Sequence, residues 1–543
     1  MTKPAIDSSQ QLRRIAAGAA ALAACLLIVG GILLLPRSNS NRMRVGDHEQ
    51  RALLQFQRAA GNPLKLHAFL DEMPKGGDLH MHLSGAIYAE TFLQDAIADK
   101  ACIDPVTFNV QPNTGLTKSI PPQPVCGKGQ QPAADALKDQ KLYDAIVDAF
   151  SMRTFVPKSG IDGHDQFFST FSRFGSLGKT HAGEWVDEVA TRAAAQNEQY
   201  LEIMHTPDFG AAAATGYAVG WNPNLPAMRD ALLAKGLRNS VAANVAEFDA
   251  MDATRNQREH CGTPQALPAC NVTVRYIYQV LRGFPPQQVF AQTLLGFEVA
   301  SVDPHVVGIN FVMPEDGYVS MNQYHQQMLM LDYLHSVYPS VHITLHAGEL
   351  AYEMVPPDGL KFHIREAIEL GHAERIGHGV DIMYESDPQS LLKEMRAKHV
   401  MVEINLTSND VILGVTGDHH PLPIYLAARV PVALSTDDEG VSRIDLTHEY
   451  ERAVNEFGFS YLDLKRSART SIEHSFLPGA DLWVTSDKFT RMNAGCDGPT
   501  YTLPQSCSDF LKGSEKARQQ WELERRFHAF ELKESQLVEA YPH

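Results

Sequence analysis

Residues 74–85 read PKGGDLHMHLSG, and within this stretch His80 and His82 stand one residue apart in an apolar run that follows a glycine turn. On a β-strand, residues i and i+2 point to the same face. A strand over Asp78–Leu83 would therefore present both imidazoles side by side, with Met81 facing the other way. Such a pair can bind a metal ion, but it also fits two polar residues on an edge strand, so its meaning depends on the remaining chain.

The chain has the composition of a globular protein, with 543 residues of which 44% are hydrophobic and 20% are charged. This length fits either one large α/β barrel with insertions or about two to three smaller domains. The formal net charge is −17, and no basic stripe interrupts the acidic balance. We therefore expect no nucleic-acid partner, because such binding depends on clustered Lys and Arg side chains.

Outside the N-terminus, short apolar runs alternate with helix-like segments. The eight runs expected to be strands are Asp78–Leu83, Tyr200–His205, Thr273–Tyr278, Val306–Val312, His342–His346, Arg375–His378, Val400–Asn405 and Val432–Ser435. The helix-like segments include Glu184–Asn197, Met321–Val337, Lys361–Gly371, Ser390–Ala397 and Pro423–Ala428. Strand–helix alternation with uninterrupted apolar strands indicates a buried parallel sheet, and this number of strands predicts a closed (β/α)8 TIM barrel.

One segment near the N-terminus does not belong to a globular core. The run Ile15–Leu35 is 21 residues long, carries no charge and lies between Arg14 and Pro36. It is long enough to span a bilayer, so we predict a transmembrane signal anchor within residues 1–36. A cleaved signal is the alternative, because Leu22–Cys25 is similar to a lipoprotein cleavage box. In both cases the body of the protein would lie outside the cytoplasm, in the periplasm or the extracellular space.

The six cysteines other than Cys25 form three couples that are local in sequence, each in a stretch rich in Pro, Gly or Gln. An even number of cysteines is typical of proteins from disulfide-forming compartments. We predict the pairs Cys102–Cys126, Cys261–Cys270 and Cys496–Cys507, with reduced surface thiols as the alternative. Because no C-x-x-C occurs, a thiolate zinc site is not expected.

These features divide the chain into four predicted parts. They are the N-terminal segment 1–36, a helical lead 37–72, a barrel 73–482 with insertions at 104–132 and 208–268, and an extension 483–543. Within the extension, Ser514–Ala540 has the pattern of a charged amphipathic helix that packs on the outside of the barrel.

Polar residues stand where several predicted strands end. The stretch TLHAGE contains His346 and Glu349, RIGHG contains His378, and STDD contains Asp437 and Asp438. The functional residues of (β/α)8 barrels gather at these carboxyl ends. Each residue alone also has a structural interpretation, as a hydrogen-bonded histidine or a helix-capping aspartate. Their joint presence on several strands favours an active site.

Three imidazoles and one carboxylate from these strand ends could form a metal site. Catalytic zinc takes N and O ligands and leaves one position open for water, and the predicted ligands His80, His82, His346 and Asp437 fit that pattern. Bound zinc makes water a stronger nucleophile near neutral pH. Glu349 and His378 would then remain as acid–base groups beside the metal, as metal-assisted hydrolysis requires.

With these pieces assembled, the sequence resembles the adenosine deaminase family of the amidohydrolase superfamily. The resemblance rests on seven motifs that follow one another between Met73 and Pro478: MPKGGDLHMHLSG, VGINF, TLHAGE, RIGHGV, EINLTSN, ALSTDDEGV and SFLP. The disulfide-bearing insertions and the apolar N-terminus resemble the secreted growth-factor-related branch more than the compact cytosolic enzymes. The resemblance implies hydrolysis of adenosine and 2′-deoxyadenosine, small purine nucleosides, to inosine and ammonia.

The resemblance also implies a role for each matching residue. It assigns one zinc ion to the four ligands named above, proton donation to purine N1 to Glu349, and orientation of the attacking water to His378. It further implies that Asp438 bonds purine N7 and that the backbone of Gly308 lies near N3. The aromatic residues of DQFFSTFSRF are similar to the helix that covers the pocket in this family; they are Phe167, Phe168 and Phe171.

One position departs from the family pattern. Many cytosolic members have an acid two residues after the second histidine, where it reaches the ribose 5′-hydroxyl, and here that position is Ser84. Together with His82, Ser84 would lie near the substrate, and a hydroxyl can still bond a ribose. The departure leaves two alternatives open: deamination of adenine or another aminopurine, and a secreted binding or signalling protein on the same scaffold.

Overall fold

A computed structural model describes residues 46–158, 160–207, 209–493, 495–497 and 503–540. Asp47–His543 form one compact unit. The predicted anchor over Ile15–Leu35 lies outside the described residues. Among the residues that are described, no helix is both long and apolar enough to cross a membrane.

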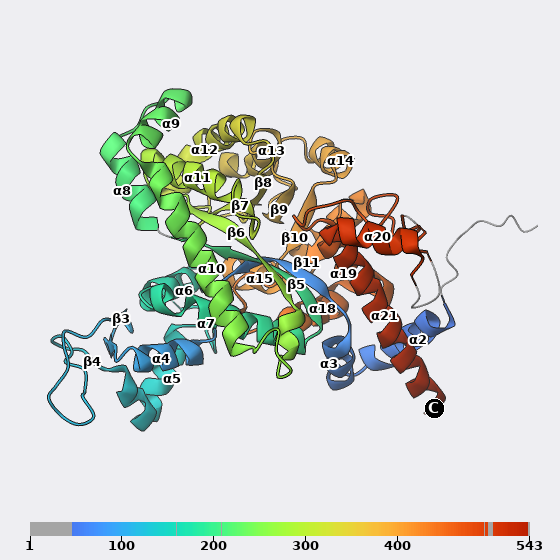
Figure 1. The fold of residues 1–543 in the computed structure, drawn as a ribbon, viewed down its shortest axis with the longest axis horizontal. Helices are drawn as coiled ribbons and strands as arrows, with labels where there is room; N and C mark the ends of the chain where they lie inside the picture. Colours follow the sequence, from blue (N-terminus) through green and yellow to red (C-terminus); the bar gives the residue numbers. More distant parts are fainter. Residues whose placement is uncertain (1–45, 159, 208, 494, 498–502, 541–543) are drawn as a thin grey trace, which may run out of the picture. The chain divides into compact units, whose positions relative to one another are not determined.

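Eight parallel strands form a nearly closed barrel, which confirms the predicted strand number and direction (Figure 1). In spatial order they are β1 (Gly76–His82), β5 (Glu198–His205), β6 (Thr273–Leu281), β7 (Val306–Val312), β8 (His342–Ala347), β9 (Arg375–His378), β10 (Met401–Ile404) and β11 (Val432–Leu434). A parallel bridge between Met81 and Asp437 joins the carboxyl ends of the first and last strands. The architecture is therefore that of a (β/α)8 barrel.

The glycines of the opening stretch extend the first strand beyond its predicted start. β1 begins at Gly76, and Gly77 pairs with Tyr200 of β5. A Cβ atom on Gly76 would lie 2.3 Å from the carbonyl oxygen of Ala468, and one on Gly77 would lie 2.5 Å from that of Tyr200. Only glycine fits such close backbone approaches, and Gly76 also has a φ of +71°. The glycine turn is thus the tightly packed entry of β1 into the barrel.

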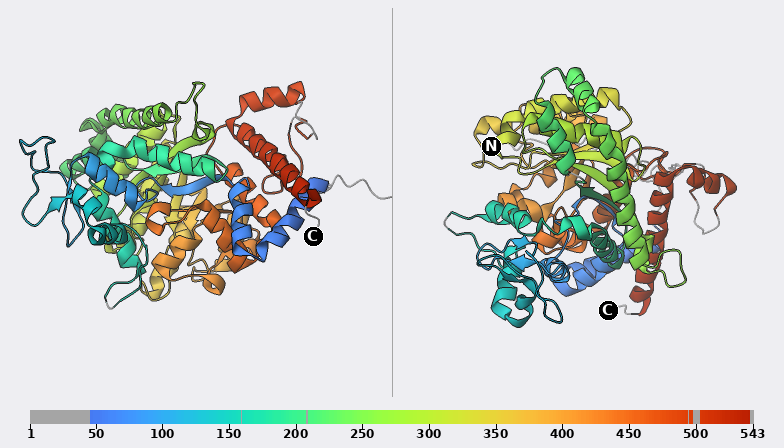
Figure 2. Two further views of the ribbon diagram at one scale, coloured as in Figure 1. Left: turned by 90° about the horizontal axis from the view of Figure 1, so that it is seen from below. Right: turned by 60° about the vertical axis from the view of Figure 1, so that its left-hand side comes forward.

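Helices follow the strands and cover the barrel (Figures 1 and 2). Between β1 and β6 lie α4 (Ala89–Ala98), α5 (Gln140–Ala149), α6 (Gly163–Phe174), α7 (Gly178–Ala195), α8 (Phe209–Val219), α9 (Leu225–Ala234) and α10 (Val241–Arg258). From β6 to β11 the helices are α11 (Pro286–Ala300), α12 (Tyr318–Val337), α13 (His363–Glu369), α14 (Pro388–Lys398), α15 (Leu406–Leu413) and α16 (Leu422–Ala428). Then follow α17 (Glu439–Ser442), α18 (Leu446–Phe457) and α19 (Tyr461–Glu473).

The helical lead and the C-terminal extension pack against each other. The lead consists of α2 (Asp47–Ala60) and α3 (Pro63–Glu72), and the extension contains α20 (Gln505–Gly513) and α21 (Glu515–Ala540). α21 packs along α2 and α19, as expected for an amphipathic helix on the outside of the barrel. Lys465 of α19 ties them together through ion pairs with Glu49 at 3.0 Å and Glu531 at 2.5 Å.

The three predicted disulfides are all present: Cys102–Cys126, Cys261–Cys270 and Cys496–Cys507. The first lies in the insertion after α4, where β2 (Cys102–Ile103), β3 (Val110–Gln111) and β4 (Gln131–Pro132) form a small antiparallel sheet.

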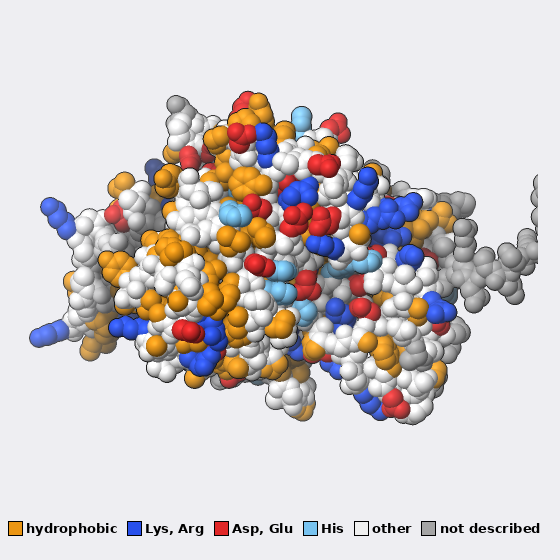
Figure 3. Space-filling view, turned by 90° about the horizontal axis from the view of Figure 1, so that it is seen from above, with side chains coloured by type: hydrophobic (Ala, Val, Ile, Leu, Met, Phe, Trp, Pro, Cys, Tyr) orange, Lys and Arg blue, Asp and Glu red, His pale blue; other side chains and the backbone are white. Residues whose placement is uncertain are grey.

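On the face shown in Figure 3, Lys and Arg side chains are interspersed with Asp and Glu side chains, with no continuous basic surface on that face.

Candidate active site

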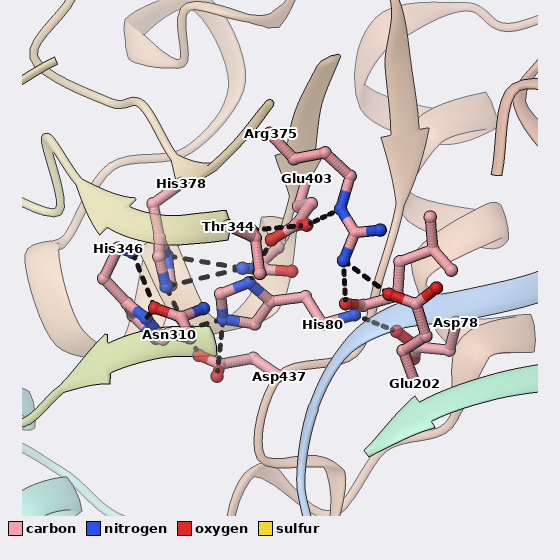
Figure 4. Close-up of polar contacts among 12 residues, drawn as sticks. Asp78, His80, Glu202, Asn310, Thr344, His346, Arg375, His378, Glu403 and Asp437 are labelled. Carbon is pink, nitrogen blue, oxygen red and sulfur yellow. Dashed lines mark hydrogen bonds and ion pairs between the residues drawn. The ribbon is translucent and has the colours of Figure 1, made fainter. Parts of the chain in front are cut away.

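The predicted ligands come from three strands and meet at the carboxyl end of the barrel. His80 and His82 lie on β1, His346 lies near the end of β8, and Asp437 follows β11. His378, the last residue of β9, lies against the same group (Figure 4). The relative exposures are 0% for His80, 9% for His82, 5% for His346 and 2% for Asp437, so the cluster is shielded from solvent.

The ring nitrogens of these histidines converge on one another. Nε2 of His346 lies 3.1 Å from Nε2 of His80 and 3.2 Å from Nε2 of His82. Oδ1 of Asp437 lies 3.4 Å and 3.2 Å from the same two histidine nitrogens. Potential ligand atoms of His80, His346, His378 and Asp437 all lie within 4.8 Å of one another.

Each histidine is oriented by a partner on its other ring nitrogen. Nδ1 of His80 contacts Oε2 of Glu403 at 2.6 Å, and Nδ1 of His82 contacts Oε1 of Gln279 at 2.7 Å. The corresponding acceptors are Oδ1 of Asn310 for His346, at 3.0 Å, and Oδ1 of Asn409 for His378, at 2.9 Å. A carboxylate or amide oxygen can only accept, so each Nδ1 donates, and in the neutral imidazole Nε2 then carries the lone pair.

This arrangement fits a metal ion. Three Nε2 lone pairs at these separations cannot hydrogen-bond with one another, because the ring protons are on Nδ1. Oδ1 of Asp437 is buried and has no hydrogen-bond partner among the described residues. A cation bound by three imidazole nitrogens and one carboxylate would satisfy all four groups, and this donor set is one that zinc uses.

A buried charge network inside the barrel supports His80, and the sequence interpretation missed it. Glu403 accepts hydrogen bonds from Nε of Arg375 at 2.6 Å and from Thr344 at 2.9 Å, and Arg375 also bonds Glu202 at 2.6 Å. Burial opposes ionisation of Glu403, but the Arg375 and His80 contacts outweigh it and lower the pKa of Glu403 to about 2. The sequence did contain a signal for this network, because a charged residue lies in each of three otherwise mainly apolar strands: Glu202 in β5, Arg375 in β9 and Glu403 in β10.

Glu349 lies beside the cluster, on the loop after β8. Its Oε1 is 3.6 Å from Nε2 of His378, and its side chain is 7% exposed. The backbone N–H groups of Gly348 and Glu349 donate to the two carboxylate oxygens of Glu315, at 3.0 Å and 2.8 Å. Burial, with the neighbouring Asp437 and Glu315 carboxylates, raises the pKa of Glu349 well above its usual range. The loop backbone at Glu349 is therefore held in place, and burial favours the protonated form of its carboxyl group.

Asp438 is set against the loop that follows β1. A Cβ atom on Gly85 would lie 1.4 Å from Oδ1 of Asp438, so the second half of the opening motif, Ser84-Gly85, leaves room for this carboxyl group. Burial and the adjacent Asp437 raise the pKa of Asp438 well above its usual range. Ser84 is half-buried beside Gly85. The substrate-binding roles of Asp438, Ser84 and His82 remain predictions.

Gly308 is placed apart from this group. It pairs with His342, the first residue of β8, whereas the cluster lies at the other end of that strand. A Cβ atom on Gly308 would meet the ring of Phe476 at 2.9 Å. Phe476 and His342 line a cavity of about 600 Å³ that the catalytic residues do not line. This position corrects the expectation that Gly308 approaches the substrate, because the third residue of β7 cannot reach the carboxyl rim.

Two residues of the cluster have an unusual backbone conformation. His378 has a φ of +68° and Asp437 a φ of +61°, values that favour glycine. Such strain costs about 1–3 kcal/mol per residue and persists where the surrounding structure holds the residue in place.

The aromatic residues of α6 contribute to the core, with Phe167 buried and Phe168 and Phe171 half-buried. Their role as a pocket cover stays a prediction.

Part of the chain is similar in sequence to known adenosine deaminases. The family model described as "Adenosine deaminase" matches residues 184–482. An adenosine deaminase from Clostridium perfringens is 38% identical over 135 residues, 25% of this chain and 37% of that protein. One from Shewanella denitrificans is 39% identical over 141 residues, 26% of this chain and 39% of that protein. The chain thus matches about two fifths of the length of these relatives.

Solved structures give more distant similarities. An Arabidopsis N6-mAMP deaminase is 20% identical, with a TM-score of 0.46, over 76% of this chain and 96% of that chain. An amidohydrolase from Burkholderia ambifaria with bound Zn is 17% identical, with a TM-score of 0.48, over 76% of this chain and 88% of that chain.

Proposed function

This chain belongs to the adenosine deaminase family, and on that basis we propose that it removes the 6-amino group of adenosine and 2′-deoxyadenosine by zinc-dependent hydrolysis, releasing inosine or deoxyinosine and ammonia. One observation carries the proposal: a buried group of three imidazoles and one carboxylate has the buried side chain of Glu349 beside it. The family match over residues 184–482 supports the same reaction class. Assignment to the secreted growth-factor-related branch remains a prediction.

In the proposed reaction, His80, His82, His346 and Asp437 would hold one zinc ion per chain. Zinc, when bound there, acts as a Lewis acid that makes water a stronger nucleophile near neutral pH. The protein supplies the orientation of the four ligands through Glu403, Gln279, Asn310 and the burial of the cluster. These outer contacts place the proton of each neutral ring on Nδ1 and aim the Nε2 atoms at one point.

Glu349 and His378 are suited to move protons during the reaction. Burial raises the pKa of Glu349 and so favours the protonated carboxyl, which can donate to purine N1. Protonation of N1 disrupts the conjugation of the ring and makes C6 more electrophilic. Nε2 of His378 has a lone pair, because Nδ1 donates to Asn409, and it lies 3.8 Å from Oδ2 of Asp437. This pair can orient the attacking water and accept its proton.

Asp438 is suited to bind the purine base. Its raised pKa favours the protonated carboxyl, which can donate a hydrogen bond. Purine N7 is an acceptor, so a protonated Asp438 is complementary to it. A carboxylate at the same position would repel the lone pair of N7, and the burial of Asp438 is therefore consistent with base recognition.

We also propose that the enzyme acts outside the cytoplasm, held there by the N-terminal segment. Three disulfides support this location, because such bonds are rare in the cytosol. The uncharged run Ile15–Leu35 supports it as well. N-terminal sequencing of protein isolated from membrane and soluble fractions distinguishes a retained anchor from a cleaved signal. Recovery of the uncleaved chain only from the cytosol would contradict the proposal.

An absorbance assay with adenosine tests the proposed reaction. Purified zinc-loaded protein is expected to convert adenosine to inosine with release of one ammonia per turnover, and Glu349→Gln is expected to stop this while zinc stays bound. Absence of turnover with both adenosine and 2′-deoxyadenosine would reject the proposal.

A second candidate is deamination of adenine or another aminopurine, and Ser84 favours it. A serine beside the pocket offers a weaker ribose contact than an acid would. The ratio of kcat/KM for adenosine to kcat/KM for adenine decides between the candidates, because a site that uses the ribose discriminates strongly against the free base. A ratio well above one supports the nucleoside, and a ratio below one supports the base.

A further inference from the structure

A buried pair of side chains, Glu315 and His363, lies behind the loop that carries Glu349. Glu315 follows β7, and His363 is the first residue of α13. Both side chains are fully buried, and Nδ1 of His363 donates to Oε1 of Glu315 at 2.5 Å. Nε2 of the same ring is buried and forms no hydrogen bond among the described residues, so Glu315 is the polar partner of this imidazole there.

Glu315 accepts hydrogen bonds from the turn that places Glu349. Its Oε1 accepts from the N–H of Gly348 at 3.0 Å, and its Oε2 accepts from the N–H of Glu349 at 2.8 Å. Gly348 has a φ of +74°, and a Cβ atom there would lie 2.4 Å from Oδ1 of Asp381, so the backbone turns in a confined space. Two buried N–H groups need two acceptors, and one carboxylate supplies both.

The ring of His363 is held in the orientation that directs Nδ1 to Glu315. It stacks on the ring of Tyr324, with the ring centroids 3.8 Å apart and the planes 16° from parallel. The hydroxyl group of Tyr324 donates to the backbone carbonyl of His363 at 2.8 Å. The next two N–H groups of α13, those of Ile364 and Arg365, donate to Oε1 of Glu385 at 2.7 Å and 3.1 Å. The start of α13 is therefore fixed, and the imidazole with it.

Arg282 connects Glu315 to the strand that carries a predicted metal ligand. Its guanidinium group is fully buried, lies 3.9 Å from Oε2 of Glu315 and donates to the backbone carbonyl of His346 at 3.1 Å. Burial opposes ionisation of Glu315, but His363, Arg282 and the N–H of Gly348 outweigh it and lower the pKa of Glu315. The carboxylate form, which can accept from all of these donors, is thus favoured.

We propose that Glu315 and His363 are positioning residues for Glu349. The pair sets the turn after β8, so that the carboxyl group of Glu349 stays beside His378, whose Nε2 lies 3.6 Å away. Their effect on the reaction passes through the backbone of Gly348 and Glu349, which Glu315 contacts. The inference rests on the proposed function, because Glu349 is the proton donor of that reaction.

Two substitutions of His363 separate its hydrogen bond from the packing of its ring. His363→Phe keeps a ring that can stack on Tyr324 but removes the donor, whereas His363→Asn keeps an N–H donor close to the position of Nδ1. His363→Phe and Glu315→Gln are expected to lower kcat for adenosine by about 10- to 100-fold, because a small displacement of a catalytic group has an effect of that size. KM and metal content are expected to stay near those of the unmodified chain, and His363→Asn is expected to keep most of the activity.

The same substitution in a chain that also carries Glu349→Gln distinguishes positioning from general damage to the fold. A residue that acts through the carboxyl group of Glu349 has nothing left to position once that group is replaced. His363→Phe is therefore expected to cause little further loss of kcat in that chain. An equal fold loss with and without Glu349→Gln would overturn the proposal.

Amide hydrogen exchange reports on the turn without any substrate. Peptides that contain Gly348 and Glu349 are expected to exchange at least about 10-fold faster in Glu315→Gln and His363→Phe, because the buried N–H groups lose their acceptor or its support. His325→Phe is the matched control, since His325 is an exposed imidazole that contacts Glu366 of the same helix α13 at 3.1 Å. It should change neither exchange at the turn nor kcat.

Unchanged exchange at the turn in both Glu315→Gln and His363→Phe would overturn the proposal, whether or not the chain deaminates adenosine. Absence of adenosine turnover in the unmodified chain would instead reject the proposed function. In that case the exchange result alone decides whether the pair sets the turn.

Discussion

Oε2 of Glu403 on β10 lies 2.6 Å from Nδ1 of His80 on β1, although 323 residues separate them in sequence. Both side chains are fully buried, and Arg375 holds the other carboxylate oxygen. The contact fixes the proton of His80 on Nδ1 and leaves Nε2 free to bind a metal. Glu403 therefore couples the charge network inside the barrel to the orientation of a predicted ligand.

Glu403→Gln is expected to lower the free energy of unfolding near neutral pH by about 3 kcal/mol, because it leaves Arg375 buried with one carboxylate fewer. The folded-state pKa of Glu403, about 2, lies below its unfolded value of about 4.3, so its stabilising contribution is complete above the unfolded pKa. That contribution is lost as pH falls through the folded pKa. Urea denaturation at several pH values should show that the difference in free energy of unfolding between the two proteins decreases in acid.

The control for Glu403 is Glu451→Gln, which breaks a contact between a partly exposed carboxylate and His67 on the surface. Exposed pairs contribute about 0–1 kcal/mol, so this variant should track the unmodified protein. If the difference in free energy of unfolding between Glu403→Gln and the unmodified protein stays constant down to strong acid, the carboxylate charge is not the cause of the destabilisation.

Glu349→Gln is expected to lower kcat by about 10²- to 10⁴-fold, the usual contribution of a general acid, while the metal content stays the same. The glutamine keeps the shape of the side chain but cannot donate a proton to purine N1. Metal analysis and steady-state kinetics on the same preparation check both parts. Glu353→Gln, an exposed acid four residues later, is the control. Normal kcat in the Glu349 variant would exclude it as the proton donor.

His82→Ala is expected to lose both bound metal and activity, because it removes one of three converging imidazoles. Added zinc should restore the chelator-treated unmodified protein but not the variant. His67→Ala, which removes an exposed histidine paired with Glu451, should behave like the unmodified protein in both assays. Full metal content in His82→Ala would place the metal on other residues.

Ser84→Asp is expected to raise the preference for adenosine over adenine by about 10-fold or more, because hydrogen bonds to a charged group contribute about 1.5–3 kcal/mol. The comparison uses kcat/KM for both substrates in both proteins. The adenine value should change little, since the free base has no ribose hydroxyl. An equal change for both substrates would show that residue 84 does not face the sugar.

The position of the site in the fold was predictable from the sequence because strand ends of a parallel barrel share one rim. His80, His346, His378 and Asp437 stand at the ends of recognisable apolar runs, and the structure brings them together. The predicted strand boundaries differ from those in the structure by a few residues. β1, for example, begins at Gly76 and not at Asp78, because its glycines allow close approaches to the neighbouring backbone.

The outer contacts could not be predicted in the same way. Glu403 and Gln279 meet His80 and His82 from strands that are not neighbours of β1, and Asn310 meets His346 from the adjacent β7. Such pairings depend on the register between strands. A charged residue inside the run MVEI was the available signal for Glu403. Gly308 shows the opposite error: a motif match placed it at the site, but its position along β7 keeps it near the other end of the barrel.

The most direct test of the central claim is a product assay with zinc-loaded, purified protein and adenosine. Inosine and ammonia are expected to form in equal amounts, with activity lost on chelation and restored by zinc. No inosine from adenosine, and no deoxyinosine from 2′-deoxyadenosine, with zinc shown to be bound at the cluster, would contradict the account.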